Sequence, residues 1–414
     1  MVDIVILDTI FNEPLFEWLT LYRPVSEFRI AGFSLRERLE RLYGRDSIYV
    51  ILKDGMQAKI ISKRHNLITQ ELPSNDFIVV NSGLIASFSN LDRFIAQLSK
   101  LEVGTGFYRN GVLLAAHLNK EYVDSYYKPK IQHRLEAPPI DLYYMKYPWN
   151  IFMYQEDIIK DDILSKFVRE EYSILKSHRG SWPVLVSKNG VFVERFVYFD
   201  TRNGPIILCE SVEIEAFSRI SGPCIIRERS KILSALVRGN TAIGPVCKVG
   251  GEIEASLIDG YSNKSHESFL GHSYVGEWVN LGAHTVTSDL KNTYGPVRVR
   301  YLGETFETGL IKVGAFIGDH VKTAIGTQIF AGKVIGVFSH VMGLVSINIP
   351  PFTIWNGYKS VLYELNPIKA SEIQMRMYGR RGIKQLDEER KYIKLIFEST
   401  LQYRLDAVKG RVKI

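Results

Sequence analysis

The most regular feature of the chain is a six-residue spacing of branched aliphatic side chains between residues 207 and 341. Each is often followed by glycine or another small residue and then by polar positions. A period of six is too short for a helical solenoid. It suits one face of a triangular parallel β-coil that turns one branched side chain inward per face. The inward positions predicted by this spacing are Ile214, Ile220, Ile226, Ile232, Val237, Ile243, Val249, Val275, Leu281, Ile317, Thr323, Ile329 and Ile335.

The pattern breaks between Val249 and Val275, where a polar segment with two histidines interrupts it. Residues 261–272 read Tyr-Ser-Asn-Lys-Ser-His-Glu-Ser-Phe-Leu-Gly-His. A parallel coil is a rigid rod, so it gives a polar excursion a firm base. We therefore expect chemistry at this break.

The first 180 residues show a different pattern, in which short apolar runs alternate with helical spacing. Ser34 is available to cap the first of the helices. This alternation favours a mostly parallel, doubly wound sheet, which binds ligands beyond the carboxyl ends of its strands. The loops at 8–23 and 81–83 are therefore candidates for binding. Strands are predicted at 2–7, 48–52 and 76–80, and helices at 35–42 and 91–98.

The remaining boundaries follow from changes in pattern. A stretch rich in proline and aromatic residues, 137–152, leads into a charged helical connector at 156–177, and β character begins at Trp182. Beyond residue 357 the six-residue spacing is absent and helical spacing returns. We predict an α/β domain over 1–180, a coil over 181–357 and a helical extension over 358–414.

Composition places the chain among ordinary globular proteins. Its 414 residues are 46% hydrophobic and 23% charged, enough for two cores and an extension. No apolar run reaches the ~18 residues that span a bilayer, and the first residues resemble a strand more than a signal peptide. The three cysteines are odd in number and lack metal-ligand spacing. We expect a reduced, cytoplasmic location and no membrane partner.

The net charge of +7 is concentrated at one end of the chain. Residues 371–414 hold eleven Lys or Arg against six Asp or Glu, together with helical spacing and an acidic start at Asp387. This segment is predicted to be a solvated helix face packed on the body. The alternative is an attractor for an anionic ligand such as the phosphates of coenzyme A. Neither interpretation calls for nucleic acid.

His266 is the sharpest candidate for catalysis. It lies among polar residues, and a histidine can take a proton from an attacking amine or hydroxyl near neutral pH. His272, His284, His320 and His340 also fall in the coil, which raises the alternative of a metal site. Coils that bind zinc place two histidines five residues apart, and no pair here has that spacing. We predict no metal at the coil.

Three segments carry a specific resemblance. They are Ile243-Gly-Pro-Val-Cys-Lys-Val-Gly-Gly-Glu, Ser262-Asn-Lys-Ser-His-Glu-Ser-Phe-Leu-Gly-His-Ser and Gly276-Glu-Trp-Val-Asn-Leu-Gly-Ala-His-Thr. Together they resemble the acyltransferase half of bifunctional UDP-N-acetylglucosamine pyrophosphorylase/glucosamine-1-phosphate acetyltransferases, and above all a divergent branch of sugar nucleotidyltransferases. The segments 22–32, 147–149 and 318–325 fit the same branch, so the resemblance covers nearly the full chain.

The resemblance implies a fold and a mechanism. A nucleotidyltransferase-like domain would precede a left-handed parallel β-helix, and the chain would form a homotrimer with its sites between subunits. His266 would deprotonate the amino group of a hexosamine 1-phosphate, which then attacks acetyl-CoA. Backbone N–H groups near Gly282 and Ala283 would hold the oxyanion. Coenzyme A would lie along 318–337.

Further site residues come from the same resemblance. Phe269, His284 and Asp289 stand where the family has tyrosine, glycine and asparagine. Asp289 could pair with His266 and raise its pKa, which makes it a second catalytic candidate. The implied substrate-binding residues are Lys248, Asn263, Lys264, Phe269 and Lys291, and the implied cofactor-binding residues are Ala283, His284, Lys322 and Thr323.

The amino-terminal half departs further from the family. Pyrophosphorylases begin with a glycine-rich loop that cradles the phosphates, whereas residues 7–14 here contain no glycine. Arg23 and Arg29 could supply positive charge to a nucleotide. Asn81 stands where a magnesium-binding aspartate is expected, and Asp8 could bind Mg²⁺ in its place. Two alternatives therefore stay open: a nucleotidylyltransferase whose coil only trimerises, or a non-catalytic protein that binds sugar nucleotides.

Overall fold

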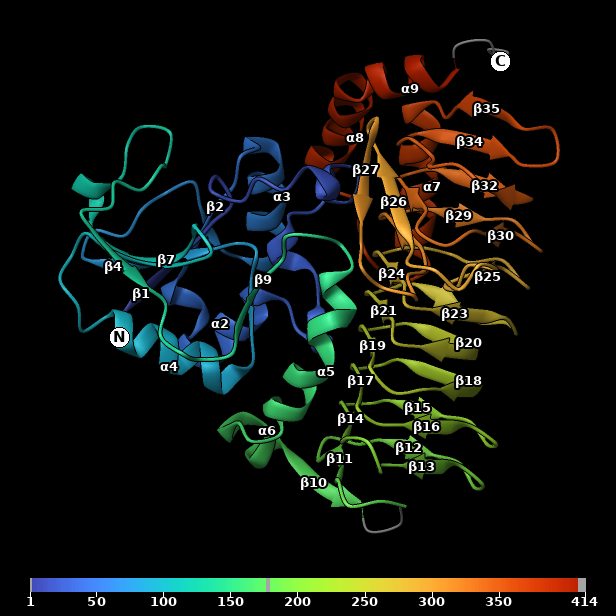
Figure 1. The fold of residues 1–414 in the computed structure, drawn as a ribbon, viewed down its shortest axis with the longest axis horizontal. Helices are drawn as coiled ribbons and strands as arrows, with labels where there is room; N and C mark the ends of the chain where they lie inside the picture. The colour runs from blue at the N-terminus through green and yellow to red at the C-terminus, as the bar shows by residue number, and fades with distance from the viewer. Residues whose placement is uncertain (1, 176–178, 409–414) are drawn as a thin grey trace.

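The computed structural model describes residues 2–175 and 179–408. An α/β domain lies beside a long parallel β-coil, and the carboxyl-terminal helices pack at the end of the coil next to the α/β domain (Figure 1). Within the described residues, no helix is both long and apolar enough to cross a membrane. The three cysteines, Cys209, Cys224 and Cys247, are buried free thiols.

The α/β domain is built on a seven-stranded mixed sheet. Its first four strands are mutually parallel, as the sequence predicts, but β7 runs antiparallel to β4 and to β6, which makes the sheet less parallel than expected. The order is β3 (Ile68–Thr69), β2 (Ile48–Ile51), β1 (Asp3–Leu7), β4 (Phe77–Asn81), β7 (Val112–Leu118), β6 (Thr105–Arg109) and β8 (His133–Glu136). A small antiparallel pair joins β5 (Leu84–Ala86) to β9 (Leu142–Tyr144).

The helices of this domain confirm the predicted spacing. Ser34 caps α2 by accepting a hydrogen bond from the Glu37 N–H, and the Glu37 side chain returns one from the Ser34 N–H. The helices are α1 (Glu17–Thr20), α2 (Leu35–Tyr43), α3 (Gly55–His65) and α4 (Phe88–Leu98). Short 3₁₀ turns are η1 (Pro14–Phe16), η2 (Val25–Glu27), η3 (Ile30–Gly32), η4 (Arg45–Ser47) and η5 (Lys120–Tyr122).

The connector runs along the side of the coil. It consists of α5 (Asn150–Asp162) and α6 (Lys166–Glu171), followed by β10 (Tyr172–Leu175). Gln155 donates to the carbonyl of Asn240 at 2.8 Å, and Asn240 donates to the carbonyl of Phe152 at 2.7 Å. The connector is therefore fastened to the coil by reciprocal amide contacts.

The coil has the parallel pairing that the six-residue spacing predicts. Its longest ladder, after β10, is β11 (Val184–Ser187), β14 (Ile206–Leu208), β17 (Cys224–Ile226), β19 (Thr241–Ile243), β21 (Leu257–Ile258), β24 (Tyr274–Val275), β28 (Phe316–Ile317) and β31 (Val334–Ile335). A second set comprises β12 (Phe192–Val193), β13 (Tyr198–Asp200), β15 (Glu213–Ile214), β16 (Arg219–Ser221), β18 (Lys231–Val237), β20 (Lys248–Glu254), β22 (Asn263–Lys264) and β23 (Phe269–Gly271).

The last turns of the coil complete its other faces. One set is β25 (Val286–Thr287), β30 (Gln328–Ile329) and β33 (Leu344–Val345), and another is β29 (Lys322–Thr323), β32 (His340–Met342), β34 (Thr353–Asn356) and β35 (Val361–Glu364). A hairpin, β26 (Arg298–Tyr301) with β27 (Glu304–Glu307), projects between two turns. The thirteen predicted inward positions are all buried.

The helices of the tail begin later than predicted, and they contact the α/β domain as well as the coil. Strand β35 pairs antiparallel with β34, so the helices start only at Pro367. They are α7 (Pro367–Gly379), α8 (Asp387–Ser399) and α9 (Leu401–Val408). Glu388 and Glu389 at the start of α8 form ion pairs with Lys63 and Arg64 of α3. The tail therefore joins the coil to the α/β domain.

Candidate active site

His266 lies on a bend between β22 and β23, with its side chain exposed. The strand pairing explains how this bend forms. Both β22 and β23 pair with the single long strand β20, so residues 265–268 project as an excursion from an otherwise regular turn. The coil thus presents an accessible imidazole on a rigid support.

Lys264 explains the break in the six-residue pattern. It pairs in register with Val249, an inward residue, so a lysine occupies an inward position and is 2% exposed. Its ammonium donates to the carbonyls of Gly250, His266 and Ser268 at 2.8, 3.1 and 2.9 Å. Burial lowers the pKa of Lys264 to about 8. The ammonium that the sequence assigns to substrate phosphate thus holds the His266 excursion from inside in this structure.

The sequence analysis suggested that Asp289 could pair with His266. In the structure its partner is His272. Its Oδ2 lies 2.7 Å from Nδ1 of His272, and the two side chains are 9% and 17% exposed. The same Oδ2 lies 2.6 Å from the position that a Cβ on Gly271 would take, and the ring of Phe269 crowds that position as well. Asp289, His272 and Phe269 therefore form one cluster, in which His272 was considered from the sequence only as a metal ligand and not as the partner of Asp289.

The predicted cofactor residues divide into two groups. His284 is exposed and Ala283 is partly exposed, so both are accessible to a ligand. Thr323 is buried, and its hydroxyl accepts from the Gly282 N–H at 2.8 Å. The Gly282 N–H therefore donates to Thr323 in this structure, and the oxyanion hole expected near Gly282 and Ala283 stays a prediction.

Lys322 is also used inside the protein. Its ammonium donates to the carbonyls of Trp278 and His320, both at 2.8 Å, and burial lowers its pKa to about 7. The predicted cofactor contact through this ammonium is thus replaced by a structural one. Like Lys264, it is a long cationic side chain folded back onto backbone oxygens.

The two remaining residues on the excursion side are differently placed. Asn263 is partly buried, with its Oδ1 accepting from Arg381 at 3.4 Å and its amide donating to Asn280 at 3.5 Å. Lys248 is exposed one strand away, in register with Asn263. Lys248 therefore presents its ammonium to solvent, whereas Asn263 is neutral and partly buried.

Lys291 lines a basic cleft of about 410 Å³ between the 288–300 segment and residues 330–333. Arg298, Arg300 and Lys333 lie in the same lining. The sequence analysis missed these three. The Arg-Val-Arg alternation of β26 could have revealed Arg298 and Arg300, because alternate residues of a strand share a face, whereas no such pattern marks Lys333. Several cations in one cleft suit a ligand that carries phosphate.

The α/β domain has its own cavity, of about 400 Å³, at the carboxyl end of β1. Asp8 lines it, is 8% exposed and accepts from the Ser82 hydroxyl at 3.0 Å. Burial raises the pKa of the Asp8 carboxyl. Glu13, Glu17 and Asp54 line the same cavity, with Lys53 as the cation among them. This lining is acidic overall and does not match the phosphates of a nucleotide by itself.

Asn81 is not available as a ligand in this cavity. Its amide donates to the Leu113 carbonyl at 2.9 Å and its Oδ1 accepts from the Gly83 N–H at 3.0 Å. Among the described residues, no three His, Cys, Asp or Glu side chains gather in a way that could hold a metal ion. Asp8 is one of four carboxylates in this lining, and Mg²⁺ usually takes one or two carboxylates and its other ligands from substrate phosphates and water.

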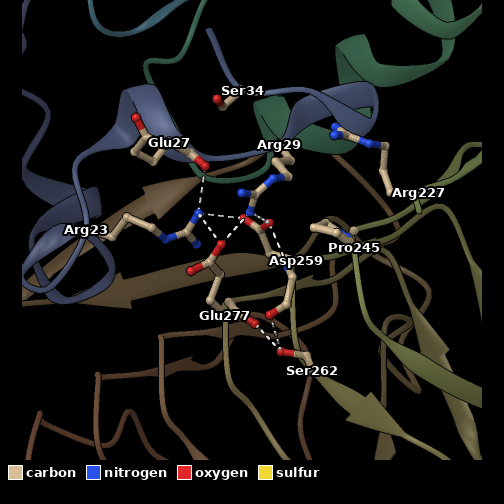
Figure 2. A network of polar contacts seen from close by, with 12 residues as sticks. Arg23, Glu27, Arg29, Ser34, Arg227, Pro245, Asp259, Ser262 and Glu277 are labelled. Carbon is tan, nitrogen blue, oxygen red and sulfur yellow. Dashed lines mark hydrogen bonds and ion pairs between the residues drawn. The ribbon is translucent and has the colours of Figure 1, made fainter. Parts of the chain in front are cut away.

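Arg23 and Arg29 face the coil, not this cavity (Figure 2). Arg23 donates to Asp259 at 2.8 Å and to Asp319 at 3.1 Å, and Arg29 donates to Asp259 at 2.9 Å and also contacts Glu277. The predicted nucleotide contacts are therefore replaced by buried ion pairs that fix the α/β domain to the coil. The partner carboxylates lie more than 200 residues away, beyond the reach of sequence reasoning.

Comparison with known proteins agrees with the resemblance stated from the sequence. Residues 7–166 match the family model described as sugar nucleotidyl transferase. A bifunctional protein GlmU of Methanococcus vannielii is 25% identical over 350 residues, which cover 75% of this chain and 80% of that protein. A bifunctional sugar-1-phosphate nucleotidylyltransferase/acetyltransferase of Sulfurisphaera tokodaii is 36% identical over 96 residues, but these cover only 23% of this chain and 24% of that protein. The predicted similarity is confirmed.

Solved structures give weaker similarities. AntD, an N-acyltransferase from Bacillus cereus, is 14% identical with a TM-score of 0.21, covering 48% of this chain and 88% of that one. A UDP-N-acetylglucosamine O-acyltransferase from Moraxella catarrhalis is also 14% identical, with a TM-score of 0.18 and coverage of 55% and 96%. At these TM-scores the fold assignment rests on the strand pairing described above.

Proposed function

We propose that this protein is a sugar-1-phosphate transferase of the bifunctional type, with acetyl-CoA-dependent N-acetylation of a hexosamine 1-phosphate at the coil. The observation that carries the proposal is the exposed His266, held on a fixed excursion by the buried Lys264. The relative named bifunctional sugar-1-phosphate nucleotidylyltransferase/acetyltransferase supports the reaction class, and the bifunctional protein GlmU is similar over most of the chain.

In this proposal, His266 acts as the general base. The imidazole takes a proton from the acceptor nitrogen as that nitrogen forms a bond to the thioester carbonyl carbon. The C–S bond then breaks, and the departing thiolate takes the proton from the imidazolium. The products are an amide and free coenzyme A, and the histidine returns to its starting state. A positioned base of this kind contributes about 10²–10⁴ in rate.

The surrounding residues divide the remaining work. Lys291 and the other cations of the basic cleft attract the phosphates of acetyl-CoA or of the acceptor, and exposed Lys248 adds charge on the excursion side. Ala283 and His284 contact the cofactor. The cluster of Phe269, His272 and Asp289 recognises the acceptor. Asp289 acts through His272, which makes it a positioning residue.

The α/β domain supplies the second activity, formation of a nucleotide sugar from the sugar 1-phosphate. The sugar nucleotidyl transferase match over 7–166 supports it. Because the cavity at β1 is lined by several carboxylates and one lysine, a nucleotide would enter it as a Mg²⁺ complex, with Asp8 as the protein ligand. Mg²⁺ would neutralise charge on the phosphates there.

Two further parts of the proposal concern assembly and location. The coil forms a homotrimer, which would bring His266 of one subunit beside the basic cleft of another. The reduced state of the three cysteines suits a cytoplasmic location. Light scattering of the purified protein measures the number of subunits. A monomer would count against a homotrimer and against sites shared between subunits.

The acetyl transfer is tested by thiol release. The protein is incubated with acetyl-CoA and either glucosamine 1-phosphate or galactosamine 1-phosphate, and free thiol is followed with a disulfide reagent. Release with at least one acceptor is expected. No release with any amino-sugar phosphate would reject the acetyltransferase and leave the coil as a trimerisation scaffold.

The second activity has an independent readout. Pyrophosphate is measured after mixing the protein with Mg²⁺, a sugar 1-phosphate and each nucleoside triphosphate in turn. Release that depends on Asp8 is expected. Silence with all nucleotides, together with measurable binding of a sugar nucleotide, would instead identify the domain as a non-catalytic binding module.

A further inference from the structure

A second cavity, of about 370 Å³, lies where the three parts of the protein meet. The α/β domain contributes α3 and the Arg23–Arg29 segment, the coil contributes Tyr261, Glu277 and Trp278, and the tail contributes Tyr378 and Ile383. It shares no lining residue with the basic cleft or with the cavity at β1. Cavities at domain interfaces with aromatic walls and a few convergent polar groups are typical ligand sites.

The ion pairs at the floor of this cavity are unequal in number. Two guanidinium groups, of Arg23 and Arg29, face three coil carboxylates, of Asp259, Glu277 and Asp319. Arg29 is also shared with Glu37 at 3.0 Å. The floor therefore holds one carboxylate more than it has guanidinium groups, and burial raises the pKa of Glu277 and of Asp319, as expected where an unmatched charge is costly.

Of the three coil carboxylates, Glu277 is the one that lines the cavity. Its side chain is 17% exposed, whereas those of Asp259 and Asp319 are 0% and 1% exposed. One oxygen of Glu277 faces the arginines, and the other is directed away from them (Figure 2). Within the described residues, that second oxygen has no hydrogen-bond donor assigned to it.

The other charged side chains of the lining are already matched. Arg64 pairs with Glu389 through a 3.2 Å hydrogen bond, and Glu27 pairs with Arg36 at 2.6 Å. His65 also lines the cavity, and burial lowers its pKa to about 4, so it is neutral near pH 7. A ligand phosphate would thus meet no unpaired cation here, whereas a cation would meet Glu277.

The walls suit a cation as well. Tyr261 and Trp278 stack with ring centroids 4.3 Å apart and planes 4° apart, and Tyr378 lies 4.5 Å from Trp278. Faces of aromatic rings attract ammonium groups, and more strongly where water is excluded. An ammonium also brings three N–H donors to the open oxygen of Glu277.

We propose that this cavity between the three parts of the protein binds the ammonium group of a small amine, through Glu277 and the Tyr261–Trp278 wall. The ligand class is a protonated primary amine whose body fits about 370 Å³, such as an amino sugar. The site is separate from the one proposed for acetyl transfer.

The test compares three sugars that share one ring. D-glucosamine at pH 7 carries an ammonium in most molecules, whereas N-acetylglucosamine and glucose carry a neutral acetamide and a hydroxyl at the same carbon; neutral pH also keeps Glu277 charged, since burial raises the pKa of its carboxyl. We expect glucosamine to bind the full chain in a calorimetric titration and to raise its melting temperature, with both neutral sugars at least about tenfold weaker. Equal binding of the three sugars, or no binding of glucosamine, would overturn the proposal.

Variants locate the bound amine. Glu277→Gln keeps the shape and removes the charge, and Ile383→Trp fills the cavity from its rim without touching the ion pairs. Both are expected to weaken glucosamine binding at least about tenfold, whereas the exposed coil substitution Glu215→Gln leaves it unchanged. His266→Ala is expected to retain the calorimetric binding, which separates this site from the acetyl-transfer site. Loss of binding in His266→Ala, or its retention in folded Ile383→Trp, would contradict the assignment.

Discussion

Arg23 Nη1 lies 2.8 Å from Asp259 Oδ2, and this contact between two almost fully buried side chains fixes the α/β domain to the coil. The two residues are 236 positions apart. Arg23 also reaches Asp319 and the hydroxyl of Tyr274, so a single side chain binds several turns of the rod. Desolvation of these groups is compensated only while the whole set is present.

Removal of this arginine should therefore destabilise the protein strongly. Arg23→Ala is expected to lower the free energy of unfolding by about 3–5 kcal/mol, because it leaves buried Asp319 without its cation and Asp259 with Arg29 alone. Urea titration followed by circular dichroism measures the change. Exposed Arg195→Ala is the matched control and should stay within about 0.5 kcal/mol of the parent. A loss no larger than that of the control would show that the ion pairs do not hold the domains together.

His266 should affect the reaction without affecting the fold. Because its side chain is exposed, His266→Ala is expected to reduce kcat for acetyl transfer about 10²–10⁴-fold and to leave the melting temperature unchanged. Thiol release from acetyl-CoA measures the rate. His133→Ala, on an exposed strand of the α/β domain, removes an imidazole elsewhere and should leave the rate unaltered. Full activity in His266→Ala would exclude it as the base.

Lys264 should affect both properties, since its ammonium supports the excursion from inside. Lys264→Met is expected to cost about 1–3 kcal/mol of stability, because three carbonyls lose a buried donor. It should also lower kcat as the bend that carries His266 loosens. Urea titration and the thiol assay are run together on Lys264→Met and on exposed Lys248→Met. Parental stability and rate in Lys264→Met would mean that the excursion is held by other contacts.

The pairing of Asp289 with His272 predicts a coupled pair of variants. Asp289→Asn removes the charge that faces His272, and His272→Asn removes the imidazole. If the aspartate acts through the histidine, the double variant should lose no more acetyl-transfer activity than the worse single variant. The ratio of rates with glucosamine 1-phosphate and galactosamine 1-phosphate should shift in each case. Additive losses of activity, with no change in the ratio of rates, would show that Asp289 does not act through His272.

Acid should weaken the fold through His65. The pKa of this imidazole is lowered from 6.5 to about 4, first by burial and then by Arg36. Between those values the unfolded chain binds a proton that the folded chain does not, so stability falls as pH drops from 6.5 towards about 4. The loss is on the order of 3 kcal/mol. Urea titration across this range should give a flatter curve for His65→Gln, whereas exposed His133→Gln should follow the parent.

The sequence predicted the coil and the place where its regular spacing is interrupted. A six-residue spacing of branched side chains is a local property, and each such residue is inward wherever the coil forms. The same locality explains why the Ser34 capping box and the helical spacing of α2 and α4 were predictable. The polar excursion that carries His266 was predictable from the break in that spacing.

Only the tertiary structure decided what the charged residues do. The guanidinium groups of Arg23 and Arg29 bind carboxylates of the coil. The ammonium groups of Lys264 and Lys322 donate to backbone carbonyls, and Asp289 pairs with His272. A long charged side chain binds whatever carboxylate or carbonyl the fold brings within about 3 Å, and sequence position says little about that partner. Spacing fixed which aliphatic side chains are buried, because burial repeats with the backbone. Charge pairing was decided by contacts across hundreds of residues.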